Sequence, residues 1–96
     1  MKIVNKNTKW TTCPCCGYKT IQGEHDGCRI CGWQHDLFQV RYPDDIGANG
    51  DLTLRQAQEN FQRTGNSEGK PSTRKTATKE DRDPNWKPLP PLAKNS

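Results

Sequence analysis

The sequence is poor in hydrophobic residues and has no long apolar run. Hydrophobic side chains make up 29% of the 96 residues, and the mean hydropathy is −1.13. No stretch offers the roughly 20 consecutive apolar residues that a membrane-spanning helix needs. Residues 1–7 also lack the apolar core of a secretory signal peptide. We therefore expect a cytoplasmic protein that does not enter a membrane.

This shortage of apolar surface means that packing alone cannot hold a chain of this length, because small domains bury a modest fraction of their surface. A bound metal supplies the missing stability in many small domains. The chain has five cysteines. Since no export signal is present, we expect a reducing environment, where cysteines bind metal more often than they form disulfides. The odd number fits four ligands and one spare.

Four of the cysteines form two copies of one motif. Residues 13–18, Cys-Pro-Cys-Cys-Gly-Tyr, and residues 28–33, Cys-Arg-Ile-Cys-Gly-Trp, both follow the pattern Cys-x-x-Cys-Gly-aromatic. The glycine permits the positive φ that turns backbone amides toward sulfur. Two facing turns of this kind supply four thiolates, the ligand set of a closed tetrahedral zinc site. We predict one structural zinc ion, held by Cys13, Cys16, Cys28 and Cys31. The alternatives are a redox dithiol or an iron site.

Other side chains have a functional and a structural interpretation. Cys15 falls outside the repeated spacing, so we expect a free thiol beside the metal; the alternatives are a reactive cysteine with a lowered pKa or a replacement ligand. His25 and His35 could bind metal, but four cysteines already complete the set, so we expect surface histidines. Asp44 and Asp45 could serve acid–base chemistry, but their Pro-Asp-Asp-x-Gly context is typical of a turn.

Short strands are expected around the first motif. Residues 10–12 and 18–21 should pair as a hairpin. Phe38, Val40 and Tyr42 alternate with polar residues, which predicts a half-buried strand. The aromatic residues beside the motifs, Trp10, Tyr18 and Trp33, are expected to form the core or shield the metal rather than stack on nucleic-acid bases.

A helix is predicted over residues 54–63. Thr53 is a good N-cap, and Gln56 three residues later completes a capping box. Leu54, Ala57 and Phe61 form one apolar stripe, which we expect to pack on the aromatic residues of the second motif and of the predicted strand. Gly65 is the expected stop.

The remaining residues, 66–96, have a different composition. The net charge of +4 divides into +1 for residues 1–65 and +3 for residues 66–96, so the basic character lies in the tail. Residues 66–83 contain no large apolar side chain, which predicts disorder. Residues 84–92 are proline-rich with Trp86 and two leucines. This segment could dock on a partner, fold back or remain inert.

Residues 13–65 resemble the bacterial cysteine-rich CPCC family. The matching motifs are Cys-Pro-Cys-Cys-Gly-Tyr at 13–18, Cys-x-x-Cys-x-Trp at 28–33, Gly-Ala-Asn at 47–49 and Glu-Asn-Phe at 59–61. The resemblance implies a small bacterial metal-binding domain and assigns it no activity. The tail beyond Gly65 falls outside the family pattern as we see it in the sequence.

We therefore predict a small α+β metal-stabilised domain over residues 1–65, a rubredoxin-like zinc ribbon of short hairpins followed by one helix, with a disordered tail over 66–96. The expected function is non-enzymatic: a monomeric zinc module that binds another protein as an adaptor or as an immunity- or antitoxin-like inhibitor. Neither an activated nucleophile nor a phosphate-binding loop is evident in the sequence. The alternative is a nucleic-acid-binding zinc ribbon with a basic tail as phosphate clamp, which the nearly neutral head disfavours.

Overall fold

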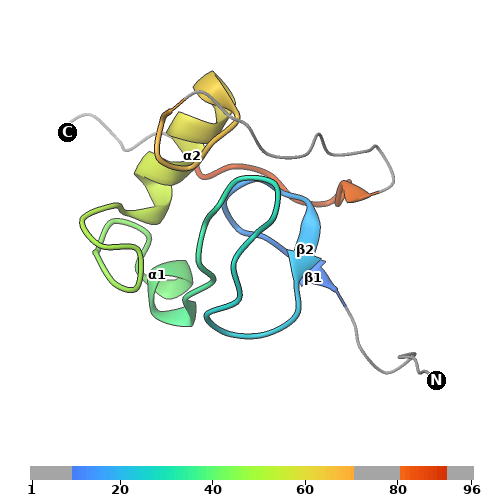
Figure 1. Cartoon of the computed structure of the whole chain (residues 1–96), viewed down its shortest axis with the longest axis horizontal. Helices are drawn as coiled ribbons and strands as arrows, with labels where there is room; N and C mark the ends of the chain where they lie inside the picture. Colours follow the sequence, from blue (N-terminus) through green and yellow to red (C-terminus); the bar gives the residue numbers. More distant parts are fainter. Residues whose placement is uncertain (1–9, 71–80, 91–96) are drawn as a thin grey trace.

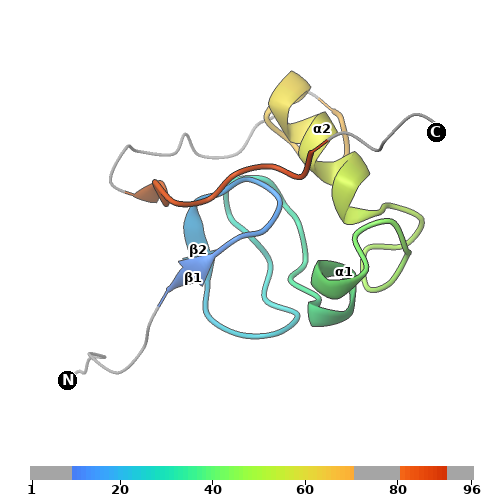
Figure 2. The same ribbon diagram turned by 180° about the vertical axis from the view of Figure 1, so that it is seen from behind.

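The computed structural model describes residues 10–70 and 81–90. Their elements are β1 (Thr11–Thr12), β2 (Lys19–Ile21), α1 (Leu37–Arg41) and α2 (Leu54–Thr64). The two strands pair antiparallel with an irregular register, so the hairpin predicted around the first motif is confirmed. Figures 1 and 2 show long loops between this hairpin and the helices. Within the two described stretches, no helix is long and apolar enough to cross a membrane.

The core is centred on sulfur rather than on aliphatic side chains. All five cysteines are buried and cluster with a few apolar residues. The apolar members are Ile21, Ile30, Trp33, Leu54 and Ala57. Trp33 is the largest fully buried side chain, which confirms its predicted place in the core, and Tyr18 packs partly buried against the cluster. Trp10, in contrast, is 53% exposed.

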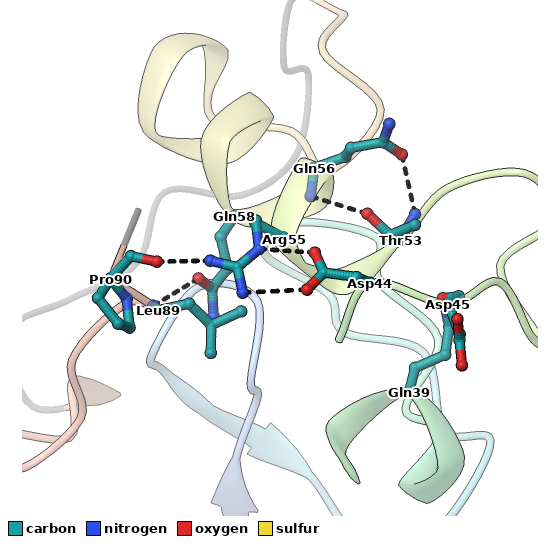
Figure 3. A network of polar contacts seen from close by, with 9 residues as sticks. All are labelled: Gln39, Asp44, Asp45, Thr53, Arg55, Gln56, Gln58, Leu89 and Pro90. Atoms are coloured by element: carbon teal, nitrogen blue, oxygen red, sulfur yellow. Dashed lines mark hydrogen bonds and ion pairs between the residues drawn. The ribbon is translucent and has the colours of Figure 1, made fainter. Parts of the chain in front are cut away.

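Helix α2 begins and ends where the capping signals indicate. The Thr53 hydroxyl accepts from the Gln56 backbone N–H at 3.1 Å, and the Gln56 side chain accepts from the Thr53 N–H at 3.0 Å, as Figure 3 shows. Gly65 ends the helix at φ 84°, and its N–H donates to the Phe61 carbonyl. The helix extends one residue beyond the predicted 54–63, and its predicted apolar stripe faces the core.

The strand predicted from Phe38, Val40 and Tyr42 is wrong, because this segment forms the short helix α1. Asp36 caps it by accepting from the Phe38 N–H. The three apolar side chains are exposed, and Gln39 between them is fully buried. The stripe of α2 therefore joins the core cluster that contains Trp33, to which Phe38 and Tyr42 do not belong.

Buried polar side chains hold α1 against the loop that follows it. Gln39 donates to the carbonyls of Asp45 and Leu52, at 2.9 and 3.0 Å. Asn49 donates to the Gln39 side chain and also pairs with both backbone groups of Gln34. The Gly-Ala-Asn motif at 47–49 thus joins the loop to the second cysteine motif.

The chain after α2 differs from the expected disordered tail. Ser67 is buried, and its N–H donates to the Cys31 carbonyl at 2.9 Å. Residues 81–90 run from the hairpin to α2 in both views (Figures 1 and 2), and Leu89 packs against the core. Of the three outcomes left open for the proline-rich segment, residues 84–90 fold back. Residues 71–80 and 91–96, the rest of the predicted tail, lie outside the described residues.

Candidate metal centre

The two cysteine motifs form the same backbone turn, which we call a knuckle. In the first, the Cys13 N–H donates to the Tyr18 carbonyl and the Gly17 N–H to the Cys13 carbonyl, at 2.8 and 2.9 Å. The second repeats this pattern with Cys28, Gly32 and Trp33, each bond at 2.9 Å. Gly17 and Gly32 have φ values of 84° and 88°, a conformation that favours glycine.

The knuckles bring together the four cysteines predicted as ligands. The sulfurs of Cys13, Cys16, Cys28 and Cys31 lie within 4.8 Å of one another, and all four residues are buried. The Cys13–Cys31 and Cys16–Cys28 sulfur pairs are each 3.7 Å apart.

This sulfur spacing fits a metal and not disulfides. A disulfide joins its sulfurs at about 2.0 Å, whereas metal–sulfur bonds of about 2.3 Å in a tetrahedron place sulfurs about 3.8 Å apart. The donor set of four buried thiols therefore matches a closed tetrahedral site.

Hydrogen bonds to the sulfurs are concentrated on the second knuckle. Cys28 Sγ accepts from the Thr20 hydroxyl at 2.9 Å and from the backbone N–H groups of Ile30 and Cys31 at 3.3 and 3.4 Å. Cys31 Sγ accepts from the Trp33 N–H at 3.4 Å. Such donors stabilise negative charge on sulfur and orient the ligands, so the second knuckle is already organised for thiolates.

The pKa values of Cys16, Cys28 and Cys31 are shifted in different directions. Hydrogen bonding from Cys13 and then Cys16 lowers the pKa of Cys28, with the Thr20 hydroxyl adding to the effect. Hydrogen bonding within the same cluster, Cys13 first, raises the pKa of Cys31 and of Cys16. The network thus favours a thiolate at Cys28 over Cys16 and Cys31. A divalent cation would take the place of the remaining protons, because metal binding requires deprotonated cysteines.

Cys15 lies outside this group of four. Its thiol is nonetheless fully buried and near enough to Cys31 to contribute to the raised pKa of that residue. Reactive cysteines are partially exposed in electropositive surroundings, whereas buried structural cysteines are inert. The position of Cys15 therefore favours a core residue over a reactive thiol.

The other predicted site residues do not join the cysteine cluster. His25 is exposed and His35 half-buried. His25 forms a separate group with Glu24 and Asp36, whose ligand atoms lie within 4.8 Å of one another. Both oxygens of Asp36 already accept backbone hydrogen bonds, and the other two side chains are open to solvent, so this group offers less to a metal than the buried sulfurs do.

Polar side chains far along the chain support the site, and sequence reasoning missed them. The Gln58 side chain is 4% exposed and donates to the Pro14 carbonyl in the first knuckle at 2.8 Å. Asn60 donates to the carbonyl of Ser67, whose N–H donates to the Cys31 carbonyl. Asn60 therefore helps to hold Ser67 against the second knuckle. The available signal for Asn60 was the Glu-Asn-Phe motif; Gln58 belongs to no motif that we identified.

No curated protein and no solved structure matches the chain. The family model described as cysteine-rich CPCC matches residues 11–83, which is well over half of the chain. The match corrects our expectation that the family pattern ends at Gly65, since it continues into the segment that folds back. The two knuckles, their shared geometry and this match together show that the chain belongs to the cysteine-rich CPCC family.

Proposed function

We propose that the chain binds one structural zinc ion through Cys13, Cys16, Cys28 and Cys31, in the manner of a zinc ribbon. The sulfur spacing and the four-thiol donor set support this proposal, because tetrahedral sites of four thiolates suit zinc or iron. Zinc carries no redox chemistry, and four protein ligands leave no open position for a substrate. The proposed role of the metal is therefore to hold the two knuckles together.

We further propose that the metal-bound frame acts by binding another protein. The observation that carries this proposal is a group of exposed apolar side chains on α1 and at its C-cap, Leu37, Phe38, Val40 and Tyr42, which we call the α1 face, with Ile46 nearby in the chain. These five side chains are between 42% and 58% exposed. In a chain so poor in hydrophobic residues, packing them inside would add stability, yet polar Gln39 takes the buried position. A contiguous exposed apolar patch marks an interaction site, and the contact between the Phe38 and Tyr42 rings makes these two side chains continuous.

Aromatic geometry makes this face suitable as an anchor. The rings of Phe38 and Tyr42 lie 5.1 Å apart with an interplanar angle of 46°, and the Arg41 guanidinium lies 5.6 Å from the centre of the Tyr42 ring. Tyrosine and arginine are enriched among the residues that dominate protein interfaces. Whether the partner is inhibited or recruited would distinguish the inhibitor role from the adaptor role.

Neither a catalytic role nor nucleic-acid binding gains support from a specific observation. Asp44, weighed for acid–base chemistry, forms an ion pair with Arg55, with its two oxygens 2.6 and 3.1 Å from the guanidinium nitrogens. Arg29 pairs with Asp81 at 3.2 Å, and Arg82 lies over the Tyr18 ring. These arginines are engaged within the fold, which leaves less cationic surface for a phosphate backbone.

The metal and the interaction face can be tested separately. Elemental analysis of purified full chain should give one zinc per chain. For the interaction, a photo-crosslinking amino acid is placed at Phe38, and a matched control carries it at exposed Lys19. A captured protein counts as the partner when, purified, it binds the chain at 1:1 and binding is lost in Phe38→Ser but kept in Lys19→Ser.

A different result would overturn each part. An iron content equal to the chain concentration would replace zinc in the first proposal. If light scattering shows a dimer that Phe38→Ser converts to a monomer, the α1 face binds a second copy, and the expectation of a monomer with a separate partner is wrong.

A further inference from the structure

The segment that folds back is held in two different ways. Its first part, residues 81–83, joins the backbone of the first knuckle: the Asp83 N–H donates to the Gly17 carbonyl at 2.9 Å, and Arg82 forms a β-bridge with Tyr18. The Asp83 side chain also accepts from the Thr12 hydroxyl. This part lies inside the family match, which ends at residue 83. Residues 84–90 lie beyond it.

Trp86 enters a position that only a glycine can leave open. A Cβ added at Gly17 would come within 2.4 Å of the Trp86 ring. The indole therefore rests directly on the backbone of the first knuckle, where Gly17 also has the positive φ that the knuckle requires. The same glycine serves the metal site and makes room for the ring.

Side chains from α2 contact the backbone of residues 89 and 90. The Leu89 N–H donates to Gln58 Oε1 at 2.8 Å, and the Pro90 carbonyl accepts from Arg55 (Figure 3). Gln58 holds the knuckle with its other amide atom, and Arg55 is fixed by Asp44. Both contacting groups are thus held in place independently of the segment.

A cleft of about 220 Å³ lies between part of this segment and α2. Its walls are Arg55, Gln58, Glu59 and Gln62 on one side and Pro88, Leu89 and Pro90 on the other. Trp86 and Leu89 are only half-buried. The segment therefore lies on the outside of the core, with Leu89 packed against it and a cleft left between the segment and α2.

We propose that Gly17, Gln58 and Arg55 form a peptide-binding groove that recognises an extended, proline-containing segment with a tryptophan and a leucine three residues apart. In this structure residues 84–90 of the chain occupy the groove in cis; its occupant in trans is a segment of another protein with the same spacing. The groove holds the segment by hydrogen bonds to its main-chain atoms and by the contact of Trp86 with Gly17, and prolines preform the extended backbone that it binds. This inference deepens the proposed protein-binding role, but uses none of the α1 face.

The stiffness of the segment fits reversible docking. Three prolines at 84, 88 and 90 restrict the unbound chain, so docking costs little ordering. Because the segment belongs to the same chain as the groove, its docking is intramolecular, and its effective concentration there exceeds that of a free partner segment. A partner segment must therefore bind more tightly than the tethered one, which makes the tail a competitor for the site.

The test measures binding of a labelled synthetic peptide with the sequence of residues 81–90 to full-length chains by fluorescence anisotropy. The double variant Trp86→Ala/Leu89→Ala has a weakened cis occupant. We expect it to bind the peptide at least about tenfold more tightly than the wild type does, because competition by the tethered segment is reduced. Lys87→Ala, a matched change at an exposed residue of the same segment, should behave as the wild type.

Three results would contradict the proposal. Adding Gln58→Ala to the double variant should abolish peptide binding, and unchanged binding would place the peptide elsewhere. A folded, zinc-loaded double variant that does not bind the peptide would show that the surface is no peptide site. If the double variant loses its zinc or its near-UV dichroism, the segment is an integral part of the domain. None of these readouts depends on Phe38, so the groove and the α1 face fail or succeed independently.

Discussion

At the scale of single residues, two glycines are required by what lies next to them. Gly17 carries the positive φ of the first knuckle and faces the Trp86 ring. Gly47 has an ordinary φ, but a Cβ there would come within 2.4 Å of Asp36 Oδ2 and 2.9 Å of Gln39 Cγ. The Gly-Ala-Asn motif thus begins with glycine because a buried carboxylate and a buried amide pass close to the backbone.

Replacing Gly47 by alanine should destabilise the fold through this crowding. The displaced atoms belong to side chains that are hydrogen-bonded and buried, so they cannot move freely, and overpacking of this kind costs about 1–3 kcal/mol. Urea unfolding of zinc-loaded Gly47→Ala measures the loss. The control is Gly23→Ala, where an added Cβ meets no described heavy atom within 4 Å; equal stability of the two variants would show that the loop relaxes.

The cysteines should differ sharply in their effect on metal content. Cys28→Ser removes the sulfur that accepts three hydrogen bonds and should leave a chain that does not retain zinc through gel filtration. Cys15→Ser keeps the four clustered sulfurs and should retain one equivalent. Zinc lost from Cys15→Ser but kept in Cys13→Ser would reverse the ligand assignment.

At the scale of elements, the two helices show how far local signals reach. Helix α2 has eleven residues, both caps and an apolar stripe, so its bounds could be predicted to within one residue. Helix α1 has five residues, too few to distinguish a period of two from a helical period. Its inward residue is a glutamine whose partners, Asn49, Asp45 and Leu52, come from the following loop, and no local pattern reveals them.

The cap of α1 predicts a pH dependence of stability. Hydrogen bonding from the Ala48 N–H, and less strongly from Phe38, lowers the pKa of Asp36 below its ordinary value of 3.8. A carboxylate with a lowered pKa in the folded state stabilises the fold above its unfolded pKa, and the contribution is lost as the pH falls through the folded value.

Asp36→Asn should therefore be less stable than the wild type at pH 7, and the difference should shrink below about pH 4. Only pH values at which both chains keep one equivalent of zinc are compared, because loss of the metal would itself unfold them. Urea unfolding from pH 7 downward over that range gives the difference in free energy. A difference that stays constant down to the lowest such pH below 4 would mean that the charge of Asp36 contributes nothing and only its shape matters.

At the scale of the whole molecule, the repeated knuckle made the candidate site predictable. Residues 13–18 and 28–33 share one spacing and one backbone turn, so the four clustered sulfurs followed from the sequence. The folding back of residues 81–90 could not be predicted from the sequence. Its contacts join Gly17 to Asp83 and Gln58 to Leu89, pairs far apart in the chain, and the polar composition between them suggested disorder. Long-range polar contacts of this kind leave no periodic signal.

Metal removal should unfold the molecule. Half of the buried core cluster consists of the five cysteines, and the ten-residue cluster cannot replace the 10 kcal/mol or so that a structural zinc contributes in small domains. Without the metal, no shared ion would hold the two knuckles together. Trp33 then loses its rigid surroundings, and Gly17 no longer holds the surface on which Trp86 rests.

Chelation should thus abolish the near-UV dichroism of the tryptophans and shift their emission toward longer wavelength. Restoring one equivalent of zinc should recover both signals, whereas magnesium should not, because hard cations prefer oxygen ligands. Trp86→Phe isolates the core in the same experiment: its remaining dichroism should still vanish on chelation if the metal holds the domain. Dichroism that survives complete removal of zinc in this variant would show that apolar packing around Trp33 is enough to keep the domain folded. The fold would then not depend on the metal.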